Sequence, residues 1–582
     1  MLTPEPMSDQ KAIMIQDGLT KKSMYRIGDP FSSICRINDK NSDSICVALL
    51  CIVWVLAAVV VNPRGDFPLN DDWAYGPAVR ILLEEGDLRF SDWTAPNLIA
   101  QVLWGAMFCL PTGFSFTTLR VSTLVLGLIG VVATYGLLRE SRAREGLSLF
   151  GALVLAFNPI YFSLSFTFMS DVPFVAVAAA SSWLYMRGLR RGSQLHIAGG
   201  LFLAGAAILI RQVGLALVLA FAPAYVVRYG LSIRRLIGAV IMVAGGIALQ
   251  NGYEAWLRKS GRLPANFGAQ IDILQTQLYH GSPSFFSDAV TITFYSLAYL
   301  GVFLFSLLVV TQWPALCRRS PALLIVLISI AAIIMAMLLA SAKSMPFYHN
   351  IIHKGGLGCC EEDPSKAPQF FWSLVTFFSI LGAFLLLLGL LRSFVITVLP
   401  ETNPQDRSLL IFGLLSTATA FAPLPMLGLG FHGFYDRYLI AFLPWLILVL
   451  VANSQALKHS DGSRVAKITG AVTLCLLSMF TIAATHDYLS ANRARWVALK
   501  RLLNEYRVNP EDIDGGFEFN GLYLYNVPHA HHPDFCCNWF VTRDYLVTYS
   551  PKPEYKVLEK IHVTQWLPWR RSEILIQAKV PH

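Results

Sequence analysis

Apolar runs of about 20 residues recur along most of the chain, and short polar segments separate them. A helix of this length crosses the hydrocarbon core of a bilayer, which is about 30 Å thick. An odd number of crossings would place the two termini on opposite sides of the membrane. The pattern predicts thirteen spans, at residues 46–62, 117–138, 147–165, 172–187, 194–210, 213–228, 235–252, 289–312, 321–342, 370–394, 408–430, 437–454 and 467–484.

Arginine and lysine test this count, because cytoplasmic connections between membrane helices are enriched in both. The prediction requires that the moderately apolar segment 97–113 lies in the membrane interface or re-enters without crossing. It also requires that 194–228 forms two helices around Arg211 and Gln212, although a single kinked helix is the alternative. The basic residues then fall on the side of the N-terminus, at 139–144, 187–191, 228–235, 318–319, 407 and 458–467.

The polar segments define three regions. Residues 1–45 are polar and lack the apolar centre of a signal peptide, so we expect a cytoplasmic tail. Residues 46–484 form the membrane domain, with a first outer loop at 63–116. Residues 485–582 are more polar and predict a small extracytoplasmic α+β domain, with a helix at 486–506 and strand-like alternation at 515–526, 538–550, 554–563 and 572–580.

Composition supports a membrane protein and excludes an ordinary soluble one. The 582 residues are 55% hydrophobic and only 14% charged, against about 25% charged in soluble domains. The net charge of +9 is spread over the connections between spans. Membrane lipids are therefore the expected surroundings, and a nucleic-acid surface is not expected.

Two neighbouring carboxylates begin a helix in the first outer loop, within the stretch FPLNDDWAYGPAVRILLEEGDLRF. Asn70 or Asp71 is the expected N-cap and Gly86 the stop signal of an interfacial helix. Adjacent helical side chains point about 100° apart, so Asp71 and Asp72 cannot share one task on the same face. One of them is a candidate reacting group; helix capping is the alternative for both.

A third carboxylate, Asp171 in FMSDVPF, falls where a span emerges on the same outer face, and Pro173 lies in the first turn of the following helix. An N-cap is again the alternative role. Asp171 and the first-loop pair are candidates for one site at membrane level.

NDDWAY in the first outer loop, FMSDVPF after the third span and FYDRYLIAFLPWLILVL near the twelfth resemble the polytopic GT-C glycosyltransferases of family 39. This group includes protein mannosyltransferases and lipid A aminoarabinose transferases, and the resemblance covers most of residues 46–490. It implies a GT-C fold and a polyprenyl-phosphate sugar donor. It also implies action outside the cytoplasm of a bacterial inner membrane, with inversion at the anomeric carbon, and an acidic pair in the first outer loop.

Such a reaction needs a base for the acceptor proton, and Asp71 is our first candidate, before Asp72. It also needs cations that stabilise the departing lipid phosphate. The outer-side candidates are Arg80, Arg211, Lys354 and Arg437. For Arg437 a surface pair with Asp436 or a lipid headgroup contact is the alternative. The resemblance implies a mobile loop over the donor near Lys354.

Metal binding is a weaker prediction. The run HAHHPDFCC, with His529, His531, His532, Asp534, Cys536 and Cys537, lacks the paired spacing of structural zinc sites, so a polar loop is the favoured interpretation. A divalent metal at the Asp71–Asp72 pair stays open, and no cofactor is assigned.

The leading functional prediction is transfer of a sugar from a polyprenyl-phosphate donor to lipid A, a glycan or a protein hydroxyl. The alternative is a transporter or flippase of lipid-linked sugars. Transporters usually carry repeat-related halves, and this sequence shows no internal repeat.

Overall fold

The computed structural model describes residues 41–280, 285–340, 347, 350–358, 365–400, 402–428, 433–456, 463–527 and 543–580. Residues 46–582 form one compact unit that is separate from residues 1–45. The predicted tail therefore lies almost wholly outside the described residues, as do His349, Cys359, Cys360 and the whole HAHHPDFCC run.

Within these ranges, eleven helical segments are long and apolar enough to cross a membrane. They are α2 (Ser42–Val61), α5 (Phe116–Glu140), α8 (Asp171–Arg191), η1 with α10 (Gln212–Tyr229), α11 (Ile233–Lys259), α13 (Phe285–Thr311), α15 (Pro321–Ala340), α16 (Gln369–Val398), α17 with η2 (Pro404–Met426), η3 with α18 (Asp436–Ser454) and α19 (Arg464–Asn504). The polytopic helical class predicted from the sequence is confirmed.

The other two predicted spans are helical but shorter. α6 (Glu145–Ala156) covers only part of 147–165, because Asn158 caps a new short helix, α7 (Pro159–Leu164). Proline at the first position of α7 cannot continue the preceding helix. α9 (Gln194–Ile208) has 15 residues. The 97–113 segment forms α4 (Ile99–Cys109), whose 11 residues span about 16 Å, too short to cross.

Residues 194–228 form two helices that run in opposite directions, as the two-helix prediction requires. At the start of α9, Ile197 contacts Gly188 near the end of α8. At the end of α10 (Leu215–Tyr229), Arg228 Nε donates to the carbonyl of Leu189, also near the end of α8, at 3.1 Å. The first turn of α9 and the last turn of α10 therefore contact the same end of α8, so the chain reverses direction around Arg211.

The helices pack closely where glycine replaces a side chain. Gly301 on α13 faces Gly382 on α16, and a Cβ on Gly382 would lie 2.2 Å from the carbonyl oxygen of Gly301. Small residues at such crossings let two helix backbones approach. Among the described spans, the η3–α18 segment is the most enclosed, because 89% of its 18-residue apolar stretch is buried.

The C-terminal region continues from the last span without a break, because α19 is a single helix of 41 residues. The boundary predicted at 484/485 falls inside α19 and stays a prediction. A four-stranded sheet follows in the order β3-β4-β6-β5, formed by Ile513–Asp514, Tyr545–Thr548, Glu573–Lys579 and Tyr555–His562. β3 pairs parallel with β4, and the other neighbours are antiparallel.

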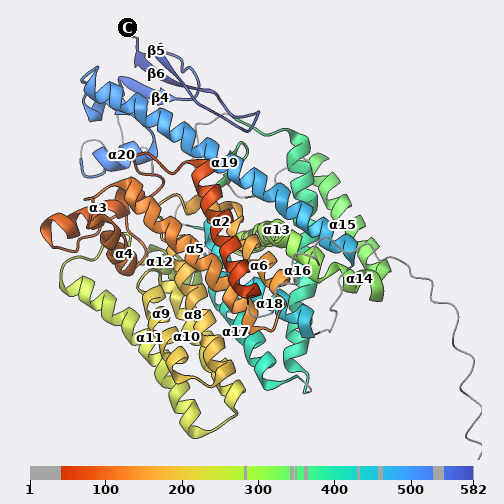
Figure 1. Ribbon diagram of the computed structural model, residues 1–582. Helices are drawn as coiled ribbons and strands as arrows, with labels where there is room; N and C mark the ends of the chain where they lie inside the picture. Colours follow the sequence, from red (N-terminus) through yellow and green to blue (C-terminus); the bar gives the residue numbers. More distant parts are fainter. Residues whose placement is uncertain are drawn as a thin grey trace, which may run out of the picture. The chain divides into compact units, whose positions relative to one another are not determined.

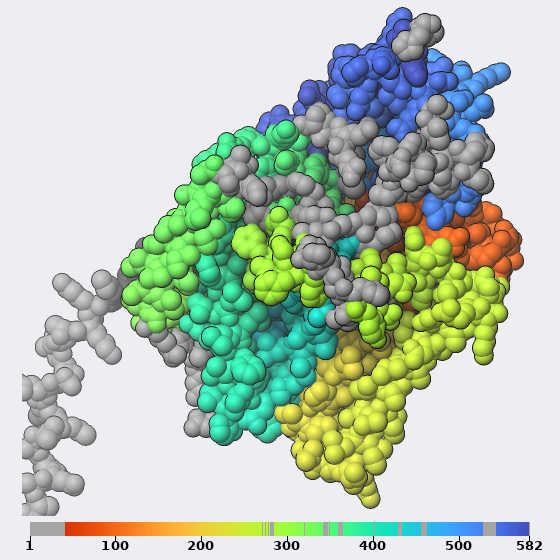
Figure 2. Space-filling model, turned by 180° about the vertical axis from the view of Figure 1, so that it is seen from behind, coloured from red at the N-terminus to blue at the C-terminus, as the bar shows by residue number. Residues whose placement is uncertain are grey.

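One predicted strand of this region is wrong. Residues 515–526 contain the helix α20 (Phe517–Leu524). α20 packs against α3 (Asp72–Glu85) of the first loop, where Gly521 leaves space for the ring of Trp73. In Figure 1 and Figure 2 the C-terminal strands and α3 lie toward one end of the helices, and the α10–α11 connection lies at the other.

Candidate active site

Asp71 lies at the start of α3, just after a residue with an unusual backbone. Asn70 has φ +51°, a left-handed conformation that Asn tolerates better than most residues. Asp71 occupies the N-cap position, but its side chain forms no capping hydrogen bond. Its Oδ1 instead accepts from Trp93 Nε1 at 3.0 Å. The capping alternative is therefore wrong for the Asp71 side chain.

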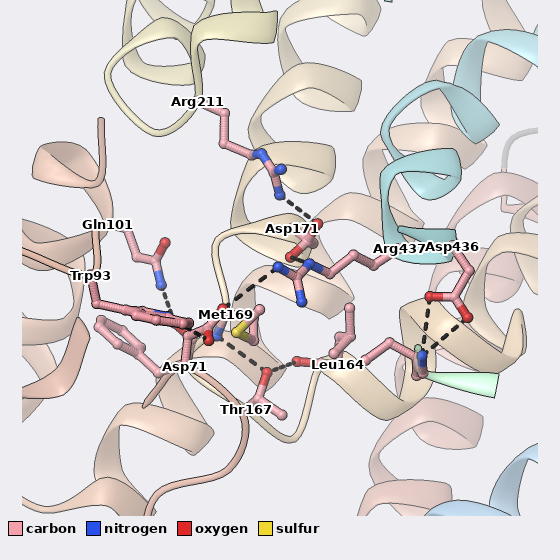
Figure 3. Close-up of polar contacts among 12 residues, drawn as sticks. Asp71, Trp93, Gln101, Leu164, Thr167, Met169, Asp171, Arg211, Asp436 and Arg437 are labelled. Atoms are coloured by element: carbon pink, nitrogen blue, oxygen red, sulfur yellow. Dashed lines mark hydrogen bonds and ion pairs between the residues drawn. The ribbon is translucent and has the colours of Figure 1, made fainter. Parts of the chain in front are cut away.

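Four side chains from separate elements form an ionic cluster, defined as Asp71, Asp171, Arg211 and Arg437. Figure 3 shows the Arg437 guanidinium between the two carboxylates. Arg437 Nη2 lies 3.6 Å from Asp71 Oδ2, and Arg437 Nε lies 4.0 Å from Asp171 Oδ2. Arg211 pairs directly with Asp171 Oδ1. The structure therefore brings together four of the seven site residues that the sequence predicts.

The pairing around Arg437 is loose. Charge-assisted N–H···O hydrogen bonds are about 2.7–2.9 Å long, and both Arg437 contacts exceed that. Within the described ranges, neither Arg437 Nε nor Asp171 Oδ2 has a hydrogen-bond partner, although both atoms are buried. Arg437 thus keeps capacity to donate to another anion.

Arg211 is held by the turn between α9 and η1 (Gln212–Gly214). That turn is fixed to the segment before α4: the amide of Leu98 donates to Ile210 O at 3.1 Å, and Gln212 Nε2 donates to Ala95 O at 3.0 Å. Asp171 is the first residue of α8. The cluster therefore lies at the beginning of α8, about 30 Å along its 21 residues from the arginines at its other end.

Tyrosine rings line the two guanidinium groups. Tyr438 lies between them, with its ring centroid 5.5 Å from Arg211 Cζ and 5.8 Å from Arg437 Cζ. Tyr435 covers Arg437 at 4.8 Å. These contacts are within the range of cation–π attraction, so the rings help to hold both cations while leaving their N–H groups for anions.

Asp72 has a different role from Asp71. It is 2% exposed, and its two oxygens accept backbone N–H groups from Leu69 at 3.2 Å and Phe168 at 2.7 Å. The carboxylate thus fixes its own loop to the segment before α8, which carries Asp171. Burial raises the pKa of Asp72 to about 8, against the opposing effect of Arg120 and the two amides. Because backbone amides already occupy both of its oxygens, Asp72 positions the loop and is a poorer candidate base.

Asp436 does not pair with Arg437 as the alternative interpretation expected. It is completely buried and accepts hydrogen bonds from the amides of Ile351 and Ile352, the latter at 2.9 Å. Tyr299 donates its hydroxyl to it at 3.3 Å. Asp436 therefore anchors the hairpin of β1 (Ile352–His353) and β2 (Gly356–Leu357) beside η3 (Asp436–Phe442).

Burial raises the pKa of both first-loop carboxylates, Asp71 and Asp72, and the freer side chain of Asp71 makes it the better candidate for the reacting group. Burial raises its pKa above the ordinary 3.8, and Arg437 and the Trp93 N–H oppose that shift by favouring the ionised form. A raised pKa makes the carboxylate a stronger base. Asp71 is 7% exposed. It is therefore enclosed, but backbone N–H groups do not occupy both of its oxygens as they do in Asp72.

Two predicted cations lie elsewhere. Arg80 is exposed on α3 and stacks on Phe114 at 5.7 Å. Lys354 is exposed in the β1–β2 turn. Within the described part of the chain, neither forms a hydrogen bond or ion pair with the ionic cluster. Among all residues that the structure describes, no group of three His, Cys, Asp or Glu side chains could hold a metal ion.

Sequence reasoning missed Trp93, the tyrosines and two residues of the C-terminal region. Glu518 on α20 accepts the amide of Asn70 at 3.1 Å and pairs with Arg495 on α19. No spacing in the sequence marks Trp93, and Glu518 lies in a segment that the alternation assigned to a strand. Trp93 reaches Asp71, and Glu518 reaches Asn70, only through the fold.

Comparisons with known proteins agree with this class of fold. The model of the dolichyl-phosphate-mannose-protein mannosyltransferase family matches residues 96–250, about a quarter of the chain, including Asp171 and Arg211. A search of curated proteins finds no match. The resemblance drawn from the motifs is thus confirmed over this segment.

Solved structures of three glycosyltransferases are similar at low identity. ArnT from Cupriavidus metallidurans bound to undecaprenyl phosphate is 16% identical, over 92% of this chain and 97% of its own, with TM-score 0.37. The S. cerevisiae Pmt1–Pmt2 complex bound to the sugar donor is 19% identical, over 36% of this chain and 33% of its own, with TM-score 0.30. EmbB from Mycobacterium smegmatis is 15% identical, over 80% and 42%, with TM-score 0.30.

The chain therefore spans about a third of the Pmt1–Pmt2 chain that it matches. The chain thus combines a polytopic helical fold with similarity to a mannosyltransferase family over residues 96–250.

Proposed function

We propose that this protein transfers a sugar from a polyprenyl-phosphate carrier to a hydroxyl acceptor outside the cytoplasm of a bacterial inner membrane. The acceptor is a lipid such as lipid A, a glycan or a protein. One observation carries the proposal: an enclosed carboxylate, Asp71, lies 3.6 Å from Arg437, whose buried Nε has no hydrogen-bond partner among the described residues, and Arg211 joins the same cluster through Asp171.

In this reaction Asp71 takes the proton of the acceptor hydroxyl while the acceptor oxygen attacks the anomeric carbon. The bond from that carbon to the phosphate oxygen breaks, and its electron pair leaves with the polyprenyl phosphate. Attack from the side opposite the phosphate inverts the anomeric configuration.

Arg211 and Arg437 stabilise the charge that develops on the leaving phosphate. The planar guanidinium can donate to two phosphate oxygens at once. Fixed donors aimed at developing charge in an enclosed site lower the barrier without reorganising. The match of residues 96–250 to the dolichyl-phosphate-mannose-protein mannosyltransferase family supports a lipid-phosphate sugar as donor.

The location of the cluster supports an extracytoplasmic site. It lies at the beginning of α8, whereas Arg190 and Arg191 lie at the end of the same helix. Arginine-rich ends of membrane helices are typically cytoplasmic. We therefore place the N-terminus in the cytoplasm, and the cluster and C-terminal domain outside.

Mass spectrometry of the lipid, glycan and envelope-protein fractions tests the proposal. Four strains of the native host are compared: one with the wild-type protein, one lacking it, one with Asp71→Asn and one with Asp87→Asn. Asp87→Asn is the matched control, because it changes a first-loop aspartate that pairs with Arg262. We expect a sugar adduct with the wild type and Asp87→Asn only. Identical profiles in all four strains, at equal protein abundance, would exclude transfer through Asp71 and favour lipid transport.

A further inference from the structure

The C-terminal region reaches the candidate base from two directions. Glu518 on α20 accepts a hydrogen bond from the backbone before Asp71. Phe517 on α20 and Tyr525 directly after it pack against Trp93, the side chain that hydrogen-bonds Asp71. Building on the proposed function, we propose that Glu518 is a positioning residue that sets the Asp71 carboxylate for catalysis through the amide of Asn70.

The backbone contact is buried and specific. Glu518 is 2% exposed, and its Oε1 accepts the amide of Asn70, itself 5% exposed, at 3.1 Å. Asn70 has φ +51°, a conformation that persists only where the surroundings hold it. The orientation of the next residue, Asp71, depends on this backbone angle of Asn70.

The second oxygen of Glu518 is occupied by a cation. Arg495, 5% exposed on α19, pairs with Oε2 through Nη2. The pair fixes the rotamer of Glu518 while Oε1 is left for Asn70. A 41-residue helix that also forms the last span thereby supports the loop of the candidate base.

The second direction runs through four aromatic rings, those of Trp73, Trp93, Phe517 and Tyr525. Trp93, which donates to Asp71, has its ring centroid 5.9 Å from Phe517 and 6.1 Å from Tyr525. Trp73 lies 5.7 Å from Trp93 and rests on Gly521, where a Cβ would come within 2.3 Å of the Trp73 ring. α20 thus also limits where the Trp93 N–H can point.

The test separates the hydrogen bond to Asn70 from the ion pair. Glu518→Leu/Arg495→Met and Glu518→Gln/Arg495→Met both remove the pair, and neither leaves a buried unpaired charge. Only the Gln variant keeps an oxygen that accepts the Asn70 amide. Glu559→Ala, which breaks the Arg501–Glu559 pair between α19 and β5, is the matched control.

The first readout needs no substrate: amide hydrogen exchange of peptides covering residues 66–75 in the full-length protein in detergent. We expect exchange at least tenfold faster in the Leu variant than in the wild type. The Gln variant and Glu559→Ala are expected to stay within threefold of the wild type. Equal exchange in the Leu and Gln variants would overturn the proposal.

The second readout separates turnover from binding. We expect sugar-adduct formation per protein to fall at least tenfold in the Leu variant only, with the affinity for undecaprenyl phosphate within twofold of the wild type. Equal loss of turnover in both double variants, or loss of turnover together with affinity, would overturn the positioning role. If wild type and Asp71→Asn give identical adduct profiles, the proposed function fails, and the exchange readout still decides whether Glu518 holds the loop.

Discussion

Replacing Arg437 by methionine should make Asp71 easier to protonate. The Arg437 Nη2 to Asp71 Oδ2 distance is 3.6 Å, which corresponds to an attraction of about 5 kcal/mol at an effective dielectric constant of about 20. The side chains are only 17% and 10% exposed, so water screens this pair incompletely. If even a third of the attraction is lost, the proton affinity of Asp71 rises about tenfold, since 1.36 kcal/mol corresponds to one decade.

The direction of the expected pKa shift of Asp71 follows from the loss of the positive charge of Arg437. Removing a cation destabilises the ionised carboxylate, so the pKa of Asp71, already raised by burial, rises further. A hydrophobic carbodiimide modifies only the protonated carboxyl. The fraction of Asp71 converted to the N-acylurea, measured by peptide mass spectrometry against pH, reports this equilibrium without any knowledge of the substrate.

Two variants make the test decisive. Arg437→Lys keeps the charge, so its labelling midpoint should stay near that of the wild type, while undecaprenyl phosphate binds more weakly because the guanidinium fork is gone. Arg80→Met, on the exposed face of α3, should change neither. A labelling midpoint in Arg437→Met that is unchanged or moves to lower pH would refute the reasoning.

Three further predictions concern the groups around Asp71. Arg211→Gln leaves Asp171, with a side chain 2% exposed, without its direct partner and should cost about 3 kcal/mol, measured as a lower unfolding midpoint in detergent. Asp436→Asn removes an acceptor of the Ile351 and Ile352 amides and should speed amide exchange in 350–358 at least tenfold, at a cost of about 1–3 kcal/mol. The pKa of Asp72 is about 8 when folded against 3.8 ordinarily, so the folded state binds its proton more tightly and stability falls as pH rises between these values. Asp72→Asn should remove that decline, which amounts to about 6 kcal/mol at most.

Each of these has a clear contrary result. An Arg211→Gln protein as stable as the wild type would mean that the ion pair with Asp171 contributes nothing net. Unchanged exchange in Asp436→Asn would show that other contacts hold the hairpin. A stability–pH curve that keeps its slope in Asp72→Asn would assign that slope to another group.

The sequence predicted the membrane helices well because burial of an apolar run depends on the run itself. It also placed Gly86 at the end of α3, where the residue has φ +68°, and the strands β5 and β6. The predicted span 147–165 missed the break at Asn158–Pro159, although proline cannot continue a helix and could have marked it.

Other elements were not decided locally. Residues 515–526 alternate like a strand, yet α20 is helical because the helix buries Glu518, Gly521 and Leu524 together, with Gly521 under the Trp73 ring. That packing depends on α3, more than 400 residues away in the chain. Local alternation therefore lost to a distant contact.

The sequence by itself determined a polytopic helical membrane protein and named Asp71, Asp171, Arg211 and Arg437 among seven candidate site residues. Only the tertiary structure decided that these four side chains meet and that Arg80 and Lys354 lie away from them. It also decided that Asp436 binds the amides of the β1–β2 hairpin and does not pair with Arg437. The physical reason is range. Hydrophobic transfer is set residue by residue along a helix, whereas ion pairs and hydrogen bonds act over a few ångströms between segments whose separation only the packed fold defines.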